Sequence, residues 1–178
     1  THFGPLYFNV YYPNGNIDTY GNNNNSTSKL SWGLSNWVDP QGNTINYFYN
    51  TSEPRLITSI MYGSGNNSST GINAIYFYYQ NRNRIESYYM GGVNTLLDKR
   101  LSKIEVKYST SVLRTYGLGY DYSVSDYDRL LFVQEGNSLG NKLNPITFEY
   151  GSSNTTIQTS TTSKTLDYDV EDFSKFRV

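Results

Sequence analysis

Several kinds of residue are scarce in this chain of 178 residues, and each absence argues against a class of function. Cysteine is absent, which excludes disulfide bonds, thiolate chemistry and cysteine-ligated zinc sites. The single histidine, His2, lies beside the terminus, which argues against a histidine base, nucleophile relay or multi-histidine metal site. Charged residues make up only 16% of the chain and the formal net charge is −1, so the electrostatics indicate no nucleic-acid or anionic-membrane partner.

No apolar run approaches the length of a membrane span, and no signal peptide is visible at the start. The chain begins THFGPLYF, without a methionine, and we expect it to be a piece of a longer protein. With 178 residues it is long enough for one domain with a hydrophobic core.

The residues that are abundant favour β-structure. There are 19 tyrosines, together with long tracts of Asn, Ser, Thr and Gly, and alanine occurs only at Ala74. Tyrosine and β-branched residues suit strands, whereas Asn, Gly and Asp suit turns. About a dozen short strands follow one another at the spacing of a meander, with no alternation of strands and helices. The sequence therefore predicts an all-β, antiparallel meander.

The segment WVDPQGNTINYFYN, Trp37 to Asn50, contains the clearest turn. Its DPQGN stretch could be a metal-binding loop or the tip of a hairpin. It lacks the acidic spacing and distal glutamate of a calcium loop, and Asp, Pro, Gly and Asn all suit a turn. We interpret it as a hairpin tip.

Two further stretches give less regular signals. INAIYFYYQ and RIESYYM flank the short sequence NRN, which we interpret as the turn of another hairpin. In LLDKRLSKIEVKYS the second half alternates, with Ile104 and Val106 on one face and Lys103 and Glu105 on the other, and predicts a strand. The first half, LLDKR, has some helical character and is left unassigned.

The order of these motifs resembles one bacterial family. FNVYYPNGNIDTYG and SWGLSNWVDPQGNTINYFY, followed by RLSKIEVKY, LRTYGLGYDY, DRLLFVQE and LNPITFEY, are similar to the Rhs/YD-repeat-like region of the virulence-plasmid protein B and insecticidal toxin-complex (Tc) B-component family. The resemblance covers Phe8 to Tyr150, with a weaker tail to Val178. No regular YDxxGRL series is present, and GYDYSVSDYDRL is an expanded version of it.

The resemblance implies a curved Rhs/YD-like sheet or an open barrel-like segment over residues 1–150. It implies that residues 151–178 are a Ser/Thr-rich linker and the start of a following FG-GAP-like propeller repeat whose cation loop is missing here. In relatives such sheets form the wall of a shell around a toxic polypeptide. The implied protein is secreted or on the bacterial cell surface, with neighbouring domains of the same polypeptide as partners.

Acidic clusters are the candidates for catalysis or metal binding. DYDVED, Asp167 to Asp172, could bind a cation, but it has no glycine for a calcium loop, and a solvated acidic linker is the simpler interpretation. Asp121, Asp126 and Asp128 could form a glycosidase pair only if the fold set two of them some 5–10 Å apart. With no tuned base or partnered nucleophile, we predict no catalytic residue, no metal and no cofactor.

Exposed aromatic residues are the candidates for a binding surface: Trp32, Trp37, Tyr47, Tyr49, Tyr76 and Tyr78. Tyrosines on a sheet can stack on sugars or anchor a protein, but the alternation favours one set in the core and the other against a neighbouring sheet or domain. We therefore predict a non-catalytic wall or scaffold segment. The alternative is a surface adhesin that binds a glycan or host protein, and an enzyme is the third hypothesis.

Overall fold

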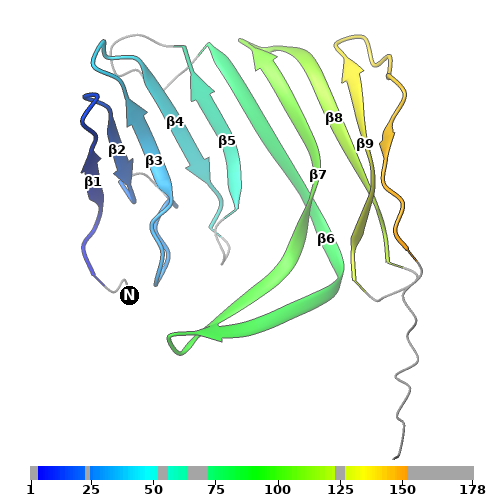
Figure 1. The fold of residues 1–178 in the computed structure, drawn as a ribbon, viewed down its shortest axis with the longest axis horizontal. Coiled ribbons are helices and arrows are strands. Elements are labelled where there is room, and N and C mark those ends of the chain that lie inside the picture. The colour runs from blue at the N-terminus through cyan, green and yellow to red at the C-terminus, as the bar shows by residue number, and fades with distance from the viewer. Residues whose placement is uncertain (1–3, 23–24, 52–55, 64–71, 123–126, 152–178) are drawn as a thin grey trace, which may run out of the picture.

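The computed structural model describes residues 4–22, 25–51, 56–63, 72–122 and 127–151. Within these residues the chain forms one 10-stranded antiparallel sheet in which every strand pairs with its neighbours in sequence (Figure 1). The strands are β1 (Phe8–Tyr11), β2 (Ile17–Tyr20), β3 (Leu34–Val38), β4 (Thr44–Tyr49), β5 (Ile57–Tyr62), β6 (Asn73–Met90), β7 (Val93–Tyr108), β8 (Ser111–Asp121), β9 (Arg129–Asn137) and β10 (Ile146–Thr147). The predicted all-β meander is confirmed, and its sheet does not close into a barrel.

The described part of the chain contains no helix, so no helical segment there could cross a membrane. Two regions that carry motifs of the family resemblance contribute little to the sheet. The region before β3 gives only an isolated bridge between Thr27 and Trp32, and LNPITFEYG gives the two-residue β10. The predicted linker and FG-GAP-like start fall on residues 152–178, which lie outside the described residues.

The DPQGN segment is a hairpin tip between β3 and β4, as predicted. The Asp39 carboxylate accepts hydrogen bonds from the backbone N–H groups of Gln41, at 2.9 Å, and Asn43, at 2.8 Å, and from the Asn43 side-chain amide, at 2.7 Å. These bonds, the Asn43 side chain first, lower the pKa of Asp39. Gly42 takes a φ of 85°, which a glycine adopts without strain. Asp39 therefore stabilises its own turn.

The predicted turn at NRN is wrong. The strand β6 runs for 18 residues through this sequence, and the hairpin closes at Gly91 and Gly92, with φ values of 54° and 78°. A glycine pair adopts positive φ more readily than Asn-Arg-Asn, so the chain turns there. NRN instead leads into a large bulge, because Asn81 pairs with Lys99 and the next pair is Glu86 with Leu97.

The bulge creates a bent arm from the distal halves of β6 and β7, which extends past the neighbouring strands in Figure 1. The unassigned LLDKR stretch is part of β7 in this arm. The tip of the arm reaches back to the region before β3: a Cβ added at Gly91 would lie 3.1 Å from a methyl carbon of Leu30. The arm therefore contacts a segment far away in the sequence.

The two faces of the sheet differ in chemistry. Residues paired across antiparallel strands lie on the same face, so the register assigns each side chain to one face. The apolar face carries the rows Tyr47–Ile60–Ile75–Val106 and Phe77–Ile104–Tyr116. The polar face carries the rows Phe48–Ser59–Tyr76–Glu105–Thr115 and Tyr78–Lys103–Gly117–Gln134.

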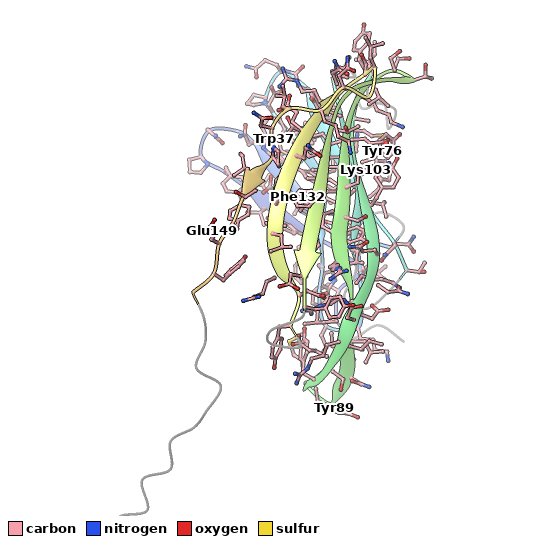
Figure 2. All side chains as sticks on the ribbon, turned by 90° about the vertical axis from the view of Figure 1, so that its right-hand side faces the viewer. Trp37, Tyr76, Tyr89, Lys103, Phe132 and Glu149 are labelled. Atoms are coloured by element: carbon pink, nitrogen blue, oxygen red, sulfur yellow. The ribbon has the colours of Figure 1, made fainter. Side chains whose placement is uncertain are left out.

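The expected hydrophobic core is not formed among the described residues. Ala74, at 6% exposure, is the one apolar side chain that is buried in this part of the chain. Figure 2 views the sheet from its β9 side and shows a single layer of strands, with Tyr76 and Lys103 on one side. Side chains such as Ile75 and Phe77 stay half-buried, since they have neighbours beside them but none above.

A cluster of charged side chains fixes the bulge of β6. The Asp128 carboxylate, whose side chain is 4% exposed, pairs with Arg100 and, at 3.3 Å, with Arg82 from the bulge. Arg100 also lies over the ring of Tyr120, 4.8 Å from its centroid, and Arg84 lies over Tyr127 at 4.3 Å. The segment before β9 is thereby tied to the bent arm.

We expect Asp128→Asn to lower the free energy of unfolding by about 3 kcal/mol, because it leaves the half-buried guanidinium of Arg100 without an anion. Arg82 keeps its ion pair with Glu86, at 3.1 Å. Urea unfolding followed by circular dichroism measures the change. The matched control is Asp98→Asn, since Asp98 pairs with Lys99 at 3.4 Å and both side chains are much more exposed than that of Asp128. The control should change the free energy of unfolding by less than about 0.5 kcal/mol. Equal effects of the two variants would contradict the role of Asp128.

Candidate functional site

Trp32, a predicted binding residue, packs against the first described residues of the chain. Its indole N–H donates to the carbonyl of Pro5 at 2.8 Å, and its ring meets Phe8 edge-to-face, with centroids 5.0 Å apart. The ring also lies close to Gly4 and Gly21, where a Cβ would come within 3.2 Å and 2.5 Å of it. These contacts hold the first described residues against the sheet.

Trp37, Tyr47 and Tyr49 lie on the apolar face. Trp37 pairs with Ile45 on one side and Asp18 on the other, and Tyr47 pairs with Ile60. The Tyr49 hydroxyl donates to the carbonyl of Leu34 at 2.9 Å. Burial is the main cause that raises the pKa values of Tyr47 and Tyr49. These side chains form part of a broad apolar surface.

Tyr76 and Tyr78 lie on the opposite, polar face. The predicted aromatic residues therefore do not form one surface: the structure separates Trp37, Tyr47 and Tyr49 from Tyr76 and Tyr78 by the thickness of the sheet. Alternation along β4 and β6 was visible in the sequence. Whether a tyrosine of β4 lies on the same face of the sheet as a tyrosine of β6 depends on the register of the strands, which the sequence alone does not give.

The polar face carries a network centred on Glu105, whose side chain is 12% exposed. Its carboxylate accepts a hydrogen bond from the Tyr78 hydroxyl at 2.7 Å and pairs with Lys103 at 2.8 Å and Lys107 at 3.1 Å. The two ammonium groups also lie over tyrosine rings, Lys103 at 4.2 Å from the Tyr78 centroid and Lys107 at 4.8 Å from that of Tyr76. Each lysine is therefore held by a carboxylate and an aromatic ring.

The network shifts the titration of its members. The hydrogen bond from Lys103, followed by those from Tyr78 and Lys107, lowers the pKa of Glu105 from 4.5 to about 2. The same carboxylate raises the pKa values of Tyr78 and Lys107. Glu105 is thus held as an anion, which suits a structural or binding role better than proton transfer.

The acidic candidates are separated and paired with arginine. Asp121 pairs with Arg129 at 3.0 Å, and Asp128 pairs with Arg82 and Arg100. Asp126 and the DYDVED cluster lie outside the described residues. Within the described ranges, no group of three or more histidine, aspartate or glutamate side chains could hold a metal ion. The absence of catalysis stays a prediction.

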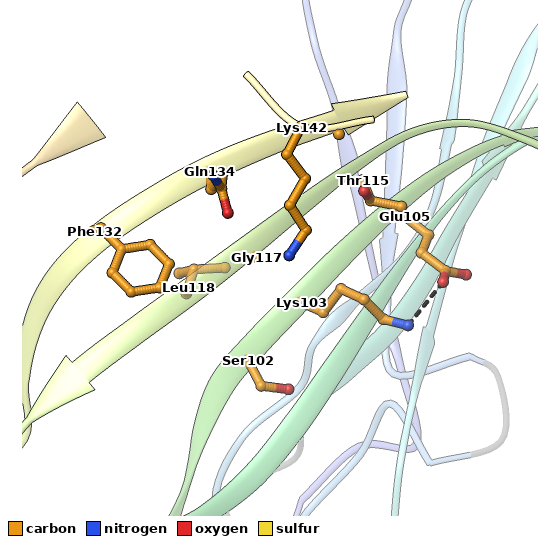
Figure 3. A pocket seen from close by; sticks show the side chains of 10 residues that line it. Ser102, Lys103, Glu105, Thr115, Gly117, Leu118, Phe132, Gln134 and Lys142 are labelled. Carbon is orange, nitrogen blue, oxygen red and sulfur yellow. Dashed lines mark hydrogen bonds and ion pairs between the residues drawn. The ribbon is translucent and has the colours of Figure 1, made fainter. Parts of the chain in front are cut away.

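Beside the Glu105 network the polar face is hollowed. The hollow has a volume of about 310 Å³ and lies over β7, β8 and β9, next to the segment that follows β9 (Figure 3). It is lined by Ser102, Lys103, Glu105, Thr115, Gly117, Leu118, Phe132, Gln134, Gly136 and Lys142. The aromatic candidates named from the sequence are not among these residues. The signal in the sequence was the alternation of Lys103, Glu105 and Lys107 in β7.

Comparisons with known proteins identify the fold. No family model and no curated protein matches the chain. The N-terminal domain of effector protein SpvB from Salmonella typhimurium strain LT2 is similar, with a TM-score of 0.63 and 14% identity, over 74% of this chain and 61% of that one. TcdB2-TccC3-Cdc42 has a TM-score of 0.64 and 15% identity, over 81% of this chain and 10% of that one.

The Photorhabdus luminescens Tc holotoxin pore gives a TM-score of 0.65 at 16% identity, again over 81% of this chain and 10% of that one. The chain therefore has a fold like that of the SpvB N-terminal domain and of part of the Tc toxin. It spans less than two thirds of each of these structures. At such identities the likeness defines the fold alone.

We expect Glu105→Gln to lower the free energy of unfolding by about 1 kcal/mol near neutral pH, because the amide cannot replace the charge-assisted bonds to Lys103 and Lys107. The pKa of Glu105 is lower in the folded chain than its ordinary value of 4.5. Its contribution is therefore complete above about pH 5 and is lost as the pH falls toward about 2.

Urea unfolding of the parent chain and the Glu105→Gln variant across this pH range tests the expectation. The difference between them should shrink as the solution is acidified. Glu149→Gln is the control, since Glu149 is exposed and extends away from the strands in Figure 2. A difference that stays constant from neutral to acidic pH would show that Glu105 does not act through its charge.

Proposed function

We propose that this chain is a non-catalytic wall segment of a larger, secreted, toxin-like protein of the Rhs/YD-repeat type. In this protein, neighbouring domains of the same polypeptide cover the apolar face and continue the sheet at its edges. The proposal joins the motif order along Phe8 to Tyr150 with the fold shared with SpvB and the Tc toxin.

The observation that carries the proposal is the uncovered apolar face. Across β4 to β8 this face presents rows of tyrosine, phenylalanine and branched aliphatic side chains, and no second layer covers them within the described residues. Contiguous apolar surface of this kind marks an interaction site in soluble proteins. Burying half-exposed apolar side chains contributes about 25 cal/mol for each Å² removed from water, so a covering layer would stabilise the sheet strongly.

The ends of the sheet support the same arrangement. The first strand, β1, has four residues, and all of them are exposed. The last strand, β10, covers only two residues of β9. Unpaired backbone groups at a sheet edge favour the addition of another strand. If the sheet continued into neighbouring segments of the polypeptide, the backbone groups at both edges would form hydrogen bonds with added strands.

The adhesin alternative stays a prediction, with a smaller candidate surface. Of the aromatic candidates, Tyr76 and Tyr78 lie together on the polar face, and the Tyr78 hydroxyl is already bonded to Glu105. Trp32 is engaged with Pro5 and Phe8. A binding surface made of all the predicted aromatic residues would have to include both faces of the sheet.

Hydroxyl-radical footprinting of the complete gene product, compared with this chain alone, tests the wall proposal. We expect Tyr47, Phe77 and Tyr116 on the apolar face to become several-fold less reactive in the complete protein, because a neighbouring layer excludes water from them. Tyr78 on the polar face serves as the internal control and should react equally in both samples. Equal reactivity of the apolar face in the two samples would contradict the proposal, and so would protection of Tyr78 alone.

A further inference from the structure

The hollow on the polar face lies where two residues of its floor, Gly117 and Gly136, have no side chain. In the row Tyr78–Lys103–Gly117–Gln134, the glycine stands between two long polar residues. Gly117 lies inside β8 and does not have the positive φ that requires a glycine. A Cβ built there would meet only the backbone oxygen of Gln134, at 4.0 Å. The backbone therefore does not demand glycine at 117, and the space above it stays open.

The floor of the hollow continues onto an aromatic ring. At Gly119, two residues further along β8, a Cβ would overlap the ring of Phe132, so this ring lies directly against the strand. Phe132 remains 36% exposed. A ring laid against the sheet, with part of its surface exposed, is a platform on which an apolar face of a ligand can stack.

The walls of the hollow carry a positive charge and hydrogen-bonding groups. In Figure 3 the Lys142 side chain extends over the hollow from the segment after β9, and Lys103 lies on the other side, in its pair with Glu105. Lys142 forms no ion pair with any residue in the described ranges, and the Lys103 side chain is 43% exposed. Gln134 donates its amide N–H to the carbonyl of Leu143 at 3.0 Å, and its side-chain oxygen is a hydrogen-bond acceptor.

We propose that this hollow binds a sugar that carries a carboxylate group. The carboxylate would pair with Lys142 and Lys103, a face of the ring would stack on Phe132, and the ring hydroxyls would bond to Thr115 and Gln134. A volume of about 310 Å³ is at the small end of ligand pockets and suits about one sugar unit. The site is distinct from the aromatic surface predicted from the sequence, and it does not depend on the wall function.

The position of the hollow favours a sugar over an acidic peptide. It lies over β7, β8 and β9, and β7 and β8 each pair with a neighbour on both sides. Their backbone groups are used in the sheet, so a peptide cannot add there as another strand. Recognition must come from side chains and the exposed ring, which is how proteins hold sugar rings.

Isothermal titration of the 178-residue chain with sialyllactose, and with lactose as the matched neutral sugar, tests the proposal. We expect sialyllactose to bind and lactose to bind at least about tenfold more weakly, which corresponds to about 1.4 kcal/mol for the charged contact. Lys142→Ala should weaken the binding of sialyllactose by a similar factor. Gly117→Val should abolish it, because the valine fills the hollow and is well suited to a strand.

Lys29→Ala is the control, since Lys29 is exposed in the region before β3 and its removal changes the net charge equally. It should leave binding unchanged. Thermal unfolding of each variant checks that the sheet is intact. If the Gly117→Val variant is unfolded, Gln134→Ala is used in its place. Gln134→Ala should weaken the binding of both sialyllactose and lactose.

Equal affinity for the two sugars, or no binding of either, would overturn the proposal. So would binding that survives both Lys142→Ala and the filling of the hollow. Polyglutamate is titrated in parallel: a peptide that binds while sialyllactose does not would assign the hollow to an acidic protein segment instead. None of these titrations involves the apolar face. The sugar site and the wall function are therefore tested independently, and either proposal can fail without affecting the test of the other.

Discussion

The ladder of backbone hydrogen bonds in one continuous sheet is the interaction on which the rest of this structure depends. Two-layer domains are stabilised chiefly by a core between the layers. Here only Ala74 among the described apolar side chains is buried, so the order of the chain comes from strand pairing and from contacts between neighbours on the same face. The tyrosines suit this situation because each supplies a large apolar ring and a hydroxyl that can be bonded, as Tyr49 and Tyr79 do with carbonyls on neighbouring strands.

The single layer also separates two kinds of chemistry. Exposure of the apolar face to water is unfavourable, and this is the face that we propose a neighbouring domain covers. The polar face satisfies its own charges through the Glu105 network and leaves the ammonium of Lys142 available beside the hollow. The Asp128 cluster stands apart from both, since it fixes the direction in which the arm of β6 and β7 leaves the sheet. The two proposals therefore place architecture and recognition on opposite faces of the same strands.

The features that depend on residues close together in the sequence could be predicted from the sequence alone. Composition and alternation predicted the all-β meander, and turn chemistry predicted the tip at Asp39. Asn-Arg-Asn was misread as a turn because the bulge that absorbs it depends on the partner strand, which local rules do not include. The hollow was missed for a similar reason: Gly117 lies beside Lys103 and Gln134 only through the register of β7, β8 and β9. A missing core cannot be seen in a chain that is rich enough in apolar residues to build one.

The strictly sequential pairing of the strands has a consequence for how the chain acquires its structure. Each strand needs only the strand made just before it, so the sheet can grow by one hairpin at a time as the ribosome releases the chain. Such a topology has a low contact order for a β protein, and β proteins of low contact order fold fast. Two closures join distant parts of the chain: Arg82 with Asp128, 46 residues apart, and the arm tip at Gly91 with Leu30. We expect these closures to be the late events, with the arm swinging into place after the strands on either side have formed.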